Sequence, residues 1–391
     1  MSRNLAIVYV LSGLRYSWFW FGIWILYYLR FTNYAGIGLV EAAMIITATI
    51  AEIPTGAIAD LLGKKKTLTA AFIFMGVGGY LMARATGLTD LVTSVIVITI
   101  GGALYSGTLE ALLFETLKGL KQEQRYSRSL AHTNSAKYIA IAIASIIGGF
   151  LYTTNPRFPF FFTSLAGFLG AFLTFFLKEP LIDTEKFSFR AYIRQTTQGF
   201  RQLFLNVAIK KITMILLSVG IFLVILWEML NDALGVSSGL TPEQLGIFFT
   251  AVYLVSAVSS YFFGKFSNKL QNLMMFLLVG LFVAATLIIS PILGLTGIIT
   301  MVALRSFTFP LFNITISTNL NQHIESRYRA TTLSTFTMIQ NLPYVLSAFF
   351  IGRLIDILSV KTFSFWLGII MIVVVGVQFL QLVQTRYRNA H

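Results

Sequence analysis

Apolar stretches of about 20 residues recur along the whole chain, separated by short polar segments. Runs such as Ile369-Ile-Met-Ile-Val-Val-Val-Gly376 show no alternation of apolar and polar positions, which disfavours a β-barrel. Stretches of this length are typical of helices that cross a bilayer. We therefore predict an all-α polytopic membrane protein with twelve transmembrane helices, at residues 4–30, 38–60, 67–86, 90–117, 129–152, 157–177, 209–236, 243–264, 272–290, 292–320, 329–352 and 361–385.

The pattern also divides the chain into two halves. A polar stretch between the sixth and seventh spans carries Phe and Arg at near-helical spacing, which predicts an amphipathic helix on the inner membrane surface. Arg-Tyr precedes the fifth span at 125–126 and the eleventh at 327–328, and glycine follows near the end of both spans. This weak repeat favours two six-helix bundles, residues 1–180 and 208–391, joined by a cytoplasmic linker at 181–207.

Most basic residues lie in the segments between the predicted spans and do not form one continuous basic surface. The chain has 29 Lys and Arg, 15 Asp and Glu and a net charge of +14, but only 11% of its residues are charged. Most of the basic residues fall in segments that lie on one side of a twelve-span topology, so the positive-inside rule predicts both termini in the cytoplasm. Nucleic acid is therefore not the expected partner, and we expect residence in the cytoplasmic membrane.

Enzyme chemistry has little support in the composition. The chain has no cysteine and three histidines, so thiolate nucleophiles are excluded and a metal site is disfavoured. No nucleotide-binding loop is present. The apolar run after Arg3 is far longer than the core of a signal peptide, so we expect it to be retained as the first span. We expect no catalytic residues, metal or cofactor.

The segment at 52–66 ends one apolar run and precedes the next, and it reads Glu-Ile-Pro-Thr-Gly-Ala-Ile-Ala-Asp-Leu-Leu-Gly-Lys-Lys-Lys. This segment resembles the signature loop of the major facilitator superfamily. Its first four residues resemble the same positions in bacterial efflux-type members, the group that includes drug:proton antiporter-like proteins. The resemblance implies a secondary transporter whose loop latches the two halves in the outward-open state. It assigns the latch to Glu52, Gly56, Asp60, Gly63, Lys64 and Lys65.

The chain departs from the efflux pattern in two spans. Efflux members often carry a proton-coupling arginine in the fourth span, whereas Thr99-Ile-Gly-Gly-Ala-Leu-Tyr-Ser106 has no basic residue. The fifth span has Ala144-Ser-Ile-Ile-Gly-Gly149 where antiporters carry a proline. A degenerate copy of the loop at 264–269 has lost its acid. Proton coupling through an arginine of the fourth span is therefore unsupported, and antiport has less support from the fifth span.

Charged side chains at membrane depth are costly, so each is a candidate for function. Arg15 lies about 16 Å into the first span, with Trp18 close by, and could anchor an anionic substrate or form a permanent ion pair. Glu52, Glu110 and Lys137 lie at similar depths, and we predict one cluster that either carries a proton or fixes the helices.

In the second half, Glu228 and Asp232 lie one helical turn apart on the seventh span. Arg305 is the expected partner of Glu228, in an ion pair that either switches with protonation or is static. The proton-coupling candidates are therefore Glu110, Lys137, Glu228 and Asp232. Aromatic and amide side chains complete the candidate substrate site, which comprises Arg15, Trp18, Tyr105, Trp227, Arg305 and Asn313.

Three functions remain open. The leading hypothesis is proton-coupled export of a small amphipathic or lipophilic compound by alternating access. The second is transport of an anionic or lipid-like solute held by Arg15 and Arg305. The third is a receptor or assembly subunit that keeps the fold without transporting. The expected partners are a small-molecule substrate, protons and the bilayer, and we expect a monomer.

Overall fold

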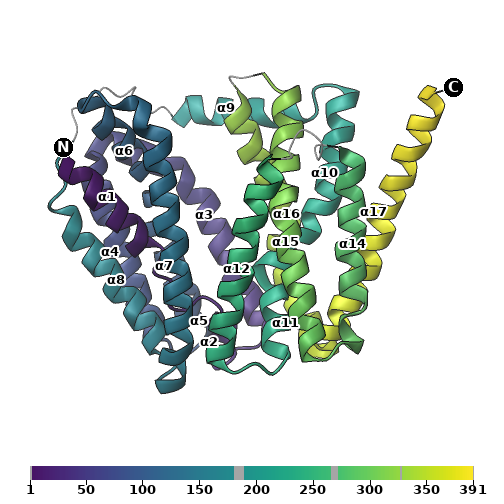
Figure 1. The fold of residues 1–391 in the computed structure, drawn as a ribbon, viewed down its shortest axis with the longest axis horizontal. Coiled ribbons are helices and arrows are strands. Elements are labelled where there is room, and N and C mark those ends of the chain that lie inside the picture. Colours follow the sequence, from purple (N-terminus) through teal and green to yellow (C-terminus); the bar gives the residue numbers. More distant parts are fainter. Residues whose placement is uncertain (1, 180–188, 266–271, 326–327, 391) are drawn as a thin grey trace. The chain divides into compact units, whose positions relative to one another are not determined.

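The computed structural model describes residues 2–179, 189–265, 272–325 and 328–390, and every regular element in these ranges is helical (Figure 1). The elements of the first part are α1 Ser2–Arg15, α2 Trp24–Tyr28, α3 Tyr34–Leu62, α4 Lys64–Ala83, α5 Leu88–Tyr105, α6 Thr108–Gly119, η1 Glu123–Arg125, α7 Tyr126–Thr154 and α8 Phe158–Thr174. They are followed by α9 Phe189–Leu203, α10 Val207–Ile225, the π-helical η2 Leu226–Leu230, α11 Asn231–Ser237, α12 Pro242–Lys265, α14 Leu273–Ile288, η3 Ser290–Ile292, α15 Leu295–His323, α16 Arg329–Leu358 and α17 Val360–Ala390.

Ten helical segments in the described ranges are long and apolar enough to cross a membrane. The two other predicted spans are shorter than expected. The sixth corresponds to α8, a helix of 17 residues. The first is divided into α1 and α2, because the chain leaves the helical conformation after Arg15 and turns at Gly22, where φ is +86°. The structure therefore supports an all-helical multi-pass protein in which the first predicted span is broken, while the count of twelve spans and the cytoplasmic termini remain predictions.

The helices form two compact units. Unit 1 contains Met1–Phe189 together with Thr241–Thr250, the first part of α12. Unit 2 contains Arg190–Leu240 and Ala251–His391. The helix predicted in the linker is present as α9, and its last residue, Leu203, accepts a hydrogen bond from Thr213 Oγ1 of α10 through its carbonyl oxygen.

Small residues allow the helices of unit 1 to pack closely. Helix α4 packs against α5 and α8. A methyl group added at Gly167 of α8 would lie 2.5 Å from the backbone nitrogen of Gly76 in α4, so the two backbones touch at this crossing. Around it lies a buried apolar core that includes Leu68, Phe72 and Leu112.

Candidate functional site

The break in the first span places irregular backbone at membrane depth. Helix α1 ends at Arg15, and residues 16–23 form a series of turns before α2. Helix α7 compensates for part of the lost helical bonding, because Ser145 Oγ donates a hydrogen bond of 2.9 Å to the Phe21 carbonyl oxygen. Non-helical backbone at this depth is tolerated only where protein buries it or where it lines a cavity. The segment after Arg15 is therefore the strongest candidate for a binding site in unit 1.

The guanidinium of Arg15 lies among three aromatic rings. Its central carbon is 5.2 Å from the ring centre of Tyr16, 5.6 Å from Trp18 and 5.6 Å from Tyr105. These distances are those of cation–π contacts. Gly102 of α5 makes room for the group, because a methyl group at that position would lie 2.9 Å from an Arg15 terminal nitrogen.

No carboxylate neutralises Arg15 among the residues that the structure describes, where the one ion pair joins Lys64 and Glu115. The Arg15 Nε atom is buried without a hydrogen-bond partner in the same part of the chain. Arg15 is only partly buried, but a buried donor atom without a partner is costly unless a ligand or solvent completes its shell. The arrangement therefore suits an anionic group bound beside an aromatic surface.

Lys137 of α7 joins the same aromatic cluster. Its Nζ lies 4.6 Å from the ring centre of Tyr16, so two cations share this ring. The predicted cluster of Lys137 with Glu52 and Glu110 differs from what is found, because the ammonium contacts rings and both carboxylate residues are exposed. The rotation of α7 about its axis decides this, because it presents Lys137 to the irregular segment after α1, where Tyr16 lies. Glu110 and Lys137 remain proposals as proton-coupling residues.

The second buried arginine, Arg305 of α15, has partners other than the predicted one. Its Nε donates to Asn231 Oδ1 at 2.9 Å and its Nη1 to Thr286 Oγ1 at 3.2 Å. The expected ion pair between Arg305 and Glu228 was wrong, because two neutral acceptors on α11 and α14 bond to Nε and Nη1, while the buried Nη2 has no hydrogen-bond partner within the described residues. Arg305 is 2% exposed and therefore cannot reach a solute without movement.

Glu228 lies in the π-helical turn η2, in which one residue is inserted into the regular hydrogen-bonding pattern. The residue is half-buried and forms no ion pair within the described ranges. Trp227, its neighbour, packs on Phe309 with ring centres 4.1 Å apart. Asn313, one turn further along α15, is exposed. Single π turns are frequent at functional sites, so Glu228 and Trp227 remain candidates within unit 2.

The loop predicted to act as a latch is held by two acids that we did not predict. Gly63 has φ of +87°, and Lys64 begins α4 immediately after it. Glu179 accepts hydrogen bonds from the backbone nitrogens of Lys64 and Lys65, at 2.7 and 2.8 Å, and thereby caps the start of the helix. Lys64 is buried, and its Nζ contacts Glu115 Oε1 at 2.5 Å.

The remaining latch candidates are less informative. The backbone of Gly56 and Asp60 is part of α3, but the surroundings of Gly56 and the side chain of Asp60 lie outside what the structure describes. Glu52 is exposed. Glu115 and Glu179 could have been suspected from sequence, because they are acids at the inner ends of the predicted fourth and sixth spans, near the lysines. Which acid meets which lysine depends on helix packing.

Replacing Glu115 with glutamine tests this ion pair. We expect the variant to lose about 1–2 kcal/mol of stability, because the buried Lys64 ammonium then has only a neutral acceptor. Thermal unfolding of the protein in detergent measures the change. Glu123→Gln, which neutralises an exposed acid of the same unit, is the matched control. Equal melting temperatures for the two variants would contradict a stabilising role of the pair.

A metal centre is not indicated in the described part of the chain, where no group of three or more His, Asp or Glu residues lies close enough to hold an ion. Unit 1 thus offers cation–aromatic recognition, and unit 2 offers a half-buried carboxylate.

Comparison with known proteins agrees with a transport function. The family model described as Major Facilitator Superfamily matches residues 5–348. An uncharacterized MFS-type transporter of Methanocaldococcus jannaschii is 22% identical over 359 residues, covering 88% of this chain and 89% of that protein. The quinolone resistance protein NorA of Staphylococcus aureus is 25% identical over 167 residues, covering 43% of this chain and 39% of NorA.

Solved structures share the architecture. The crystal structure of the nucleoside transporter NupG superposes with a TM-score of 0.80, covering 96% of this chain and 98% of NupG. At 15% sequence identity, this likeness concerns the fold alone.

Proposed function

The chain belongs to the major facilitator superfamily, and on that premise we propose that it exports a small amphipathic organic anion across the cytoplasmic membrane, coupled to protons. Its family identifies it as a multi-pass membrane transporter rather than an enzyme. The choice of substrate class rests on one observation, the Arg15 guanidinium that lies among three aromatic rings without a carboxylate partner in the described structure.

The chemistry of this cluster favours a ligand with two parts. A carboxylate or phosphate would take the unused Arg15 donor, and the nearby Lys137 would add a second positive charge. A flat or apolar body would pack on the rings, where Trp18 stacks on Trp20 with centres 5.4 Å apart. Lipophilic compounds without an acidic group would leave the buried Arg15 Nε unpaired, so we expect them to bind less well.

Arg305 is given a structural role in this proposal. Arg305 is buried and bonds to Asn231 and Thr286, which favours a structural role in holding α11, α14 and α15 together. A two-point clamp formed with Arg15 would require Arg305 to leave these partners. Arg15 alone is therefore the proposed anion anchor.

Export and proton coupling are the finer parts of the proposal. Export is favoured by the relative named for quinolone resistance. Coupling is assigned to Glu228, which is half-buried in a π turn and free of an ion pair within the described part of unit 2. A carboxyl group in such surroundings can gain and lose a proton as solvent access alternates between the two sides of the membrane.

The deciding experiment is proton flux in liposomes that contain the purified protein. Acidic amphiphiles, lipophilic cations and organic phosphates are added in turn under an imposed pH gradient, and the internal pH is recorded. Flux triggered by acidic amphiphiles supports the proposal, whereas flux triggered by cations alone overturns the substrate class. Transport without proton movement removes the coupling, and absence of both would favour a receptor or assembly subunit.

The Glu228→Gln variant tests the coupling residue. We expect substrate accumulation driven by a pH gradient to fall about tenfold or more, because glutamine cannot exchange a proton. Substrate exchange at equal pH on both sides should persist, since the binding cluster of unit 1 is untouched. Glu325→Gln, at an exposed acid of the same unit, is the control. Unchanged pH-driven accumulation in the Glu228 variant would remove this residue from the mechanism.

A further inference from the structure

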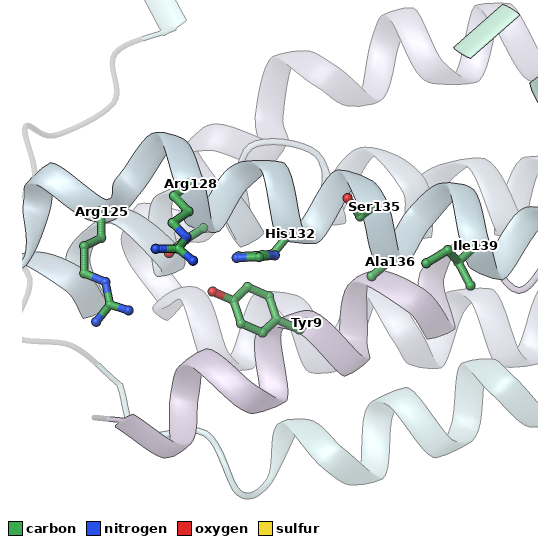
Figure 2. Close-up of a pocket in the computed structure, with 8 residues that line it drawn as sticks. Tyr9, Arg125, Arg128, His132, Ser135, Ala136 and Ile139 are labelled. Atoms are coloured by element: carbon green, nitrogen blue, oxygen red, sulfur yellow. The ribbon is translucent and has the colours of Figure 1, made fainter. Parts of the chain in front are cut away.

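A basic pocket opens between α1 and the first half of α7 in unit 1, apart from the Arg15 cluster. Its volume is about 490 Å³, and it is lined by side chains that include Tyr9, Arg125, Arg128, His132, Ser135 and Ile139. Figure 2 shows Arg128 and His132 of α7, with Arg125 at the end of η1 just before this helix, on the side that faces Tyr9. The pocket is therefore built by two helices, and the proposed transport mechanism does not use it.

The charge of the pocket calls for an anion. None of the side chains that line it is acidic, whereas two are arginines. Arg125 donates a hydrogen bond to Gln122, but Arg128 forms neither a hydrogen bond nor an ion pair in the described part of the chain. The His132 ring packs edge-on against Tyr9 with centres 5.7 Å apart, which positions the imidazole and the phenol at the rim. Both arginines thus have donors to spare for phosphate oxygens.

The pocket changes from polar to apolar along α7. Arg125 and Ile139 are about 21 Å apart by helical rise, and the arginines, His132 and Ser135 lie at one end. Beyond Ile139 the same helix face carries exposed Ile143, Ile147 and Phe150. A headgroup followed by an acyl chain has this order of chemistry, whereas a free phosphate ion would use the polar end alone.

The position along the membrane normal agrees with a lipid. Asn4 of α1 bonds to Thr116 and to the Lys178 carbonyl oxygen, so the starts of α1 and α7 lie at the same end of unit 1 as the lysine-rich turn before α4. This end carries the basic residues that the topology prediction assigns to the cytoplasm. The polar end of the pocket then lies at the headgroup level of the inner leaflet.

We propose that this pocket binds the headgroup of one anionic phospholipid of the inner leaflet, with an acyl chain along the exposed apolar face of α7. Arg125 and Arg128 contact the phosphate, and the Tyr9 hydroxyl and Ser135 lie within the headgroup region. The lipid would steady α1 and α7, the two helices that carry Arg15 and Lys137.

Native mass spectrometry of the full-length protein tests the proposal. The protein is released from detergent micelles that contain phosphatidylglycerol or phosphatidylcholine with identical acyl chains, and the bound lipid is counted. We expect wild type to retain phosphatidylglycerol, and the Arg125→Gln/Arg128→Gln variant to lose about tenfold or more of this binding. Arg125→Lys/Arg128→Lys, which keeps the charge, should retain most of it.

The matched control is Lys210→Gln/Lys211→Gln, which removes two exposed charges at the start of α10, outside the pocket. It should bind phosphatidylglycerol like wild type. Equal loss in both glutamine pairs would mean unspecific charge attraction and would overturn the site, as would unchanged binding in the arginine pair. Displacement of the lipid by inorganic phosphate at equal concentration would identify a free-anion pocket instead.

Discussion

Replacing Arg15 with glutamine should strongly weaken the binding of an acidic amphiphile. The change removes the guanidinium that lies over Tyr16, Trp18 and Tyr105, and with it the charge-assisted hydrogen bonds to the ligand. Since a hydrogen bond to a charged group contributes about 1.5–3 kcal/mol, affinity should fall by about tenfold to a hundredfold. Equilibrium binding of a fluorescent carboxylate to the detergent-purified protein measures this loss directly.

Two further variants make the Arg15 result specific. Arg15→Lys keeps the charge but loses the planar fork, so we expect binding between that of wild type and that of the glutamine variant. Arg84→Gln removes an exposed arginine at the end of α4, in the same unit, and should bind the ligand like wild type. Normal carboxylate binding by Arg15→Gln would refute the anion anchor, while the transporter assignment, which rests on the family, would stand.

Gly148→Val should destabilise the protein severely. A methyl group at Gly148 of α7 would overlap the carbonyl oxygen of Phe19, which belongs to the irregular segment after Arg15. Backbone cannot move aside as a flexible side chain can, so we expect a loss of more than about 2 kcal/mol. The melting temperature in detergent and the yield of folded protein measure the effect.

The control for Gly148 is a glycine without neighbours. Gly376 lies inside α17, and a methyl group there would meet nothing within 4 Å. Gly376→Ala should therefore be neutral or stabilise by up to about 1 kcal/mol, the difference in helix propensity. A Gly148 variant as stable as this control would show that the irregular segment does not pack against α7 as described.

These two predictions concern one feature, because Gly148 accommodates the break that positions Arg15. Ser145, one turn earlier on α7, bonds to the Phe21 carbonyl oxygen. Small residues on α7 thus allow irregular backbone to approach, and the irregular backbone turns the rings of Tyr16 and Trp18 toward the guanidinium. The fifth span lacks the proline of antiporters but keeps small residues. In unit 1 these small residues allow the irregular backbone to approach α7.

The class of the protein could be predicted without its structure. Apolar runs of bilayer length specify spanning helices, because backbone polar groups in lipid must bond internally. The glycine before Lys64 was also readable, since a tight turn between two spans requires a conformation with positive φ. Arg15 could be identified as a candidate from its depth alone, because a charged side chain inside a membrane is energetically costly.

Which side chains contact one another depends on how the helices pack. Hydropathy gives the length of a helix but neither its rotation nor its neighbours, so the partners of buried charges were mispredicted. Arg305 bonds to Asn231 and Thr286 rather than to Glu228, and Lys137 meets the Tyr16 ring rather than a carboxylate. The break after Arg15 was also invisible, because the run from 4 to 30 is predominantly apolar and long enough to span, and the contacts that stabilise the irregular backbone come from α7, more than a hundred residues later. Such contacts depend on packing between distant segments, which a local pattern does not contain.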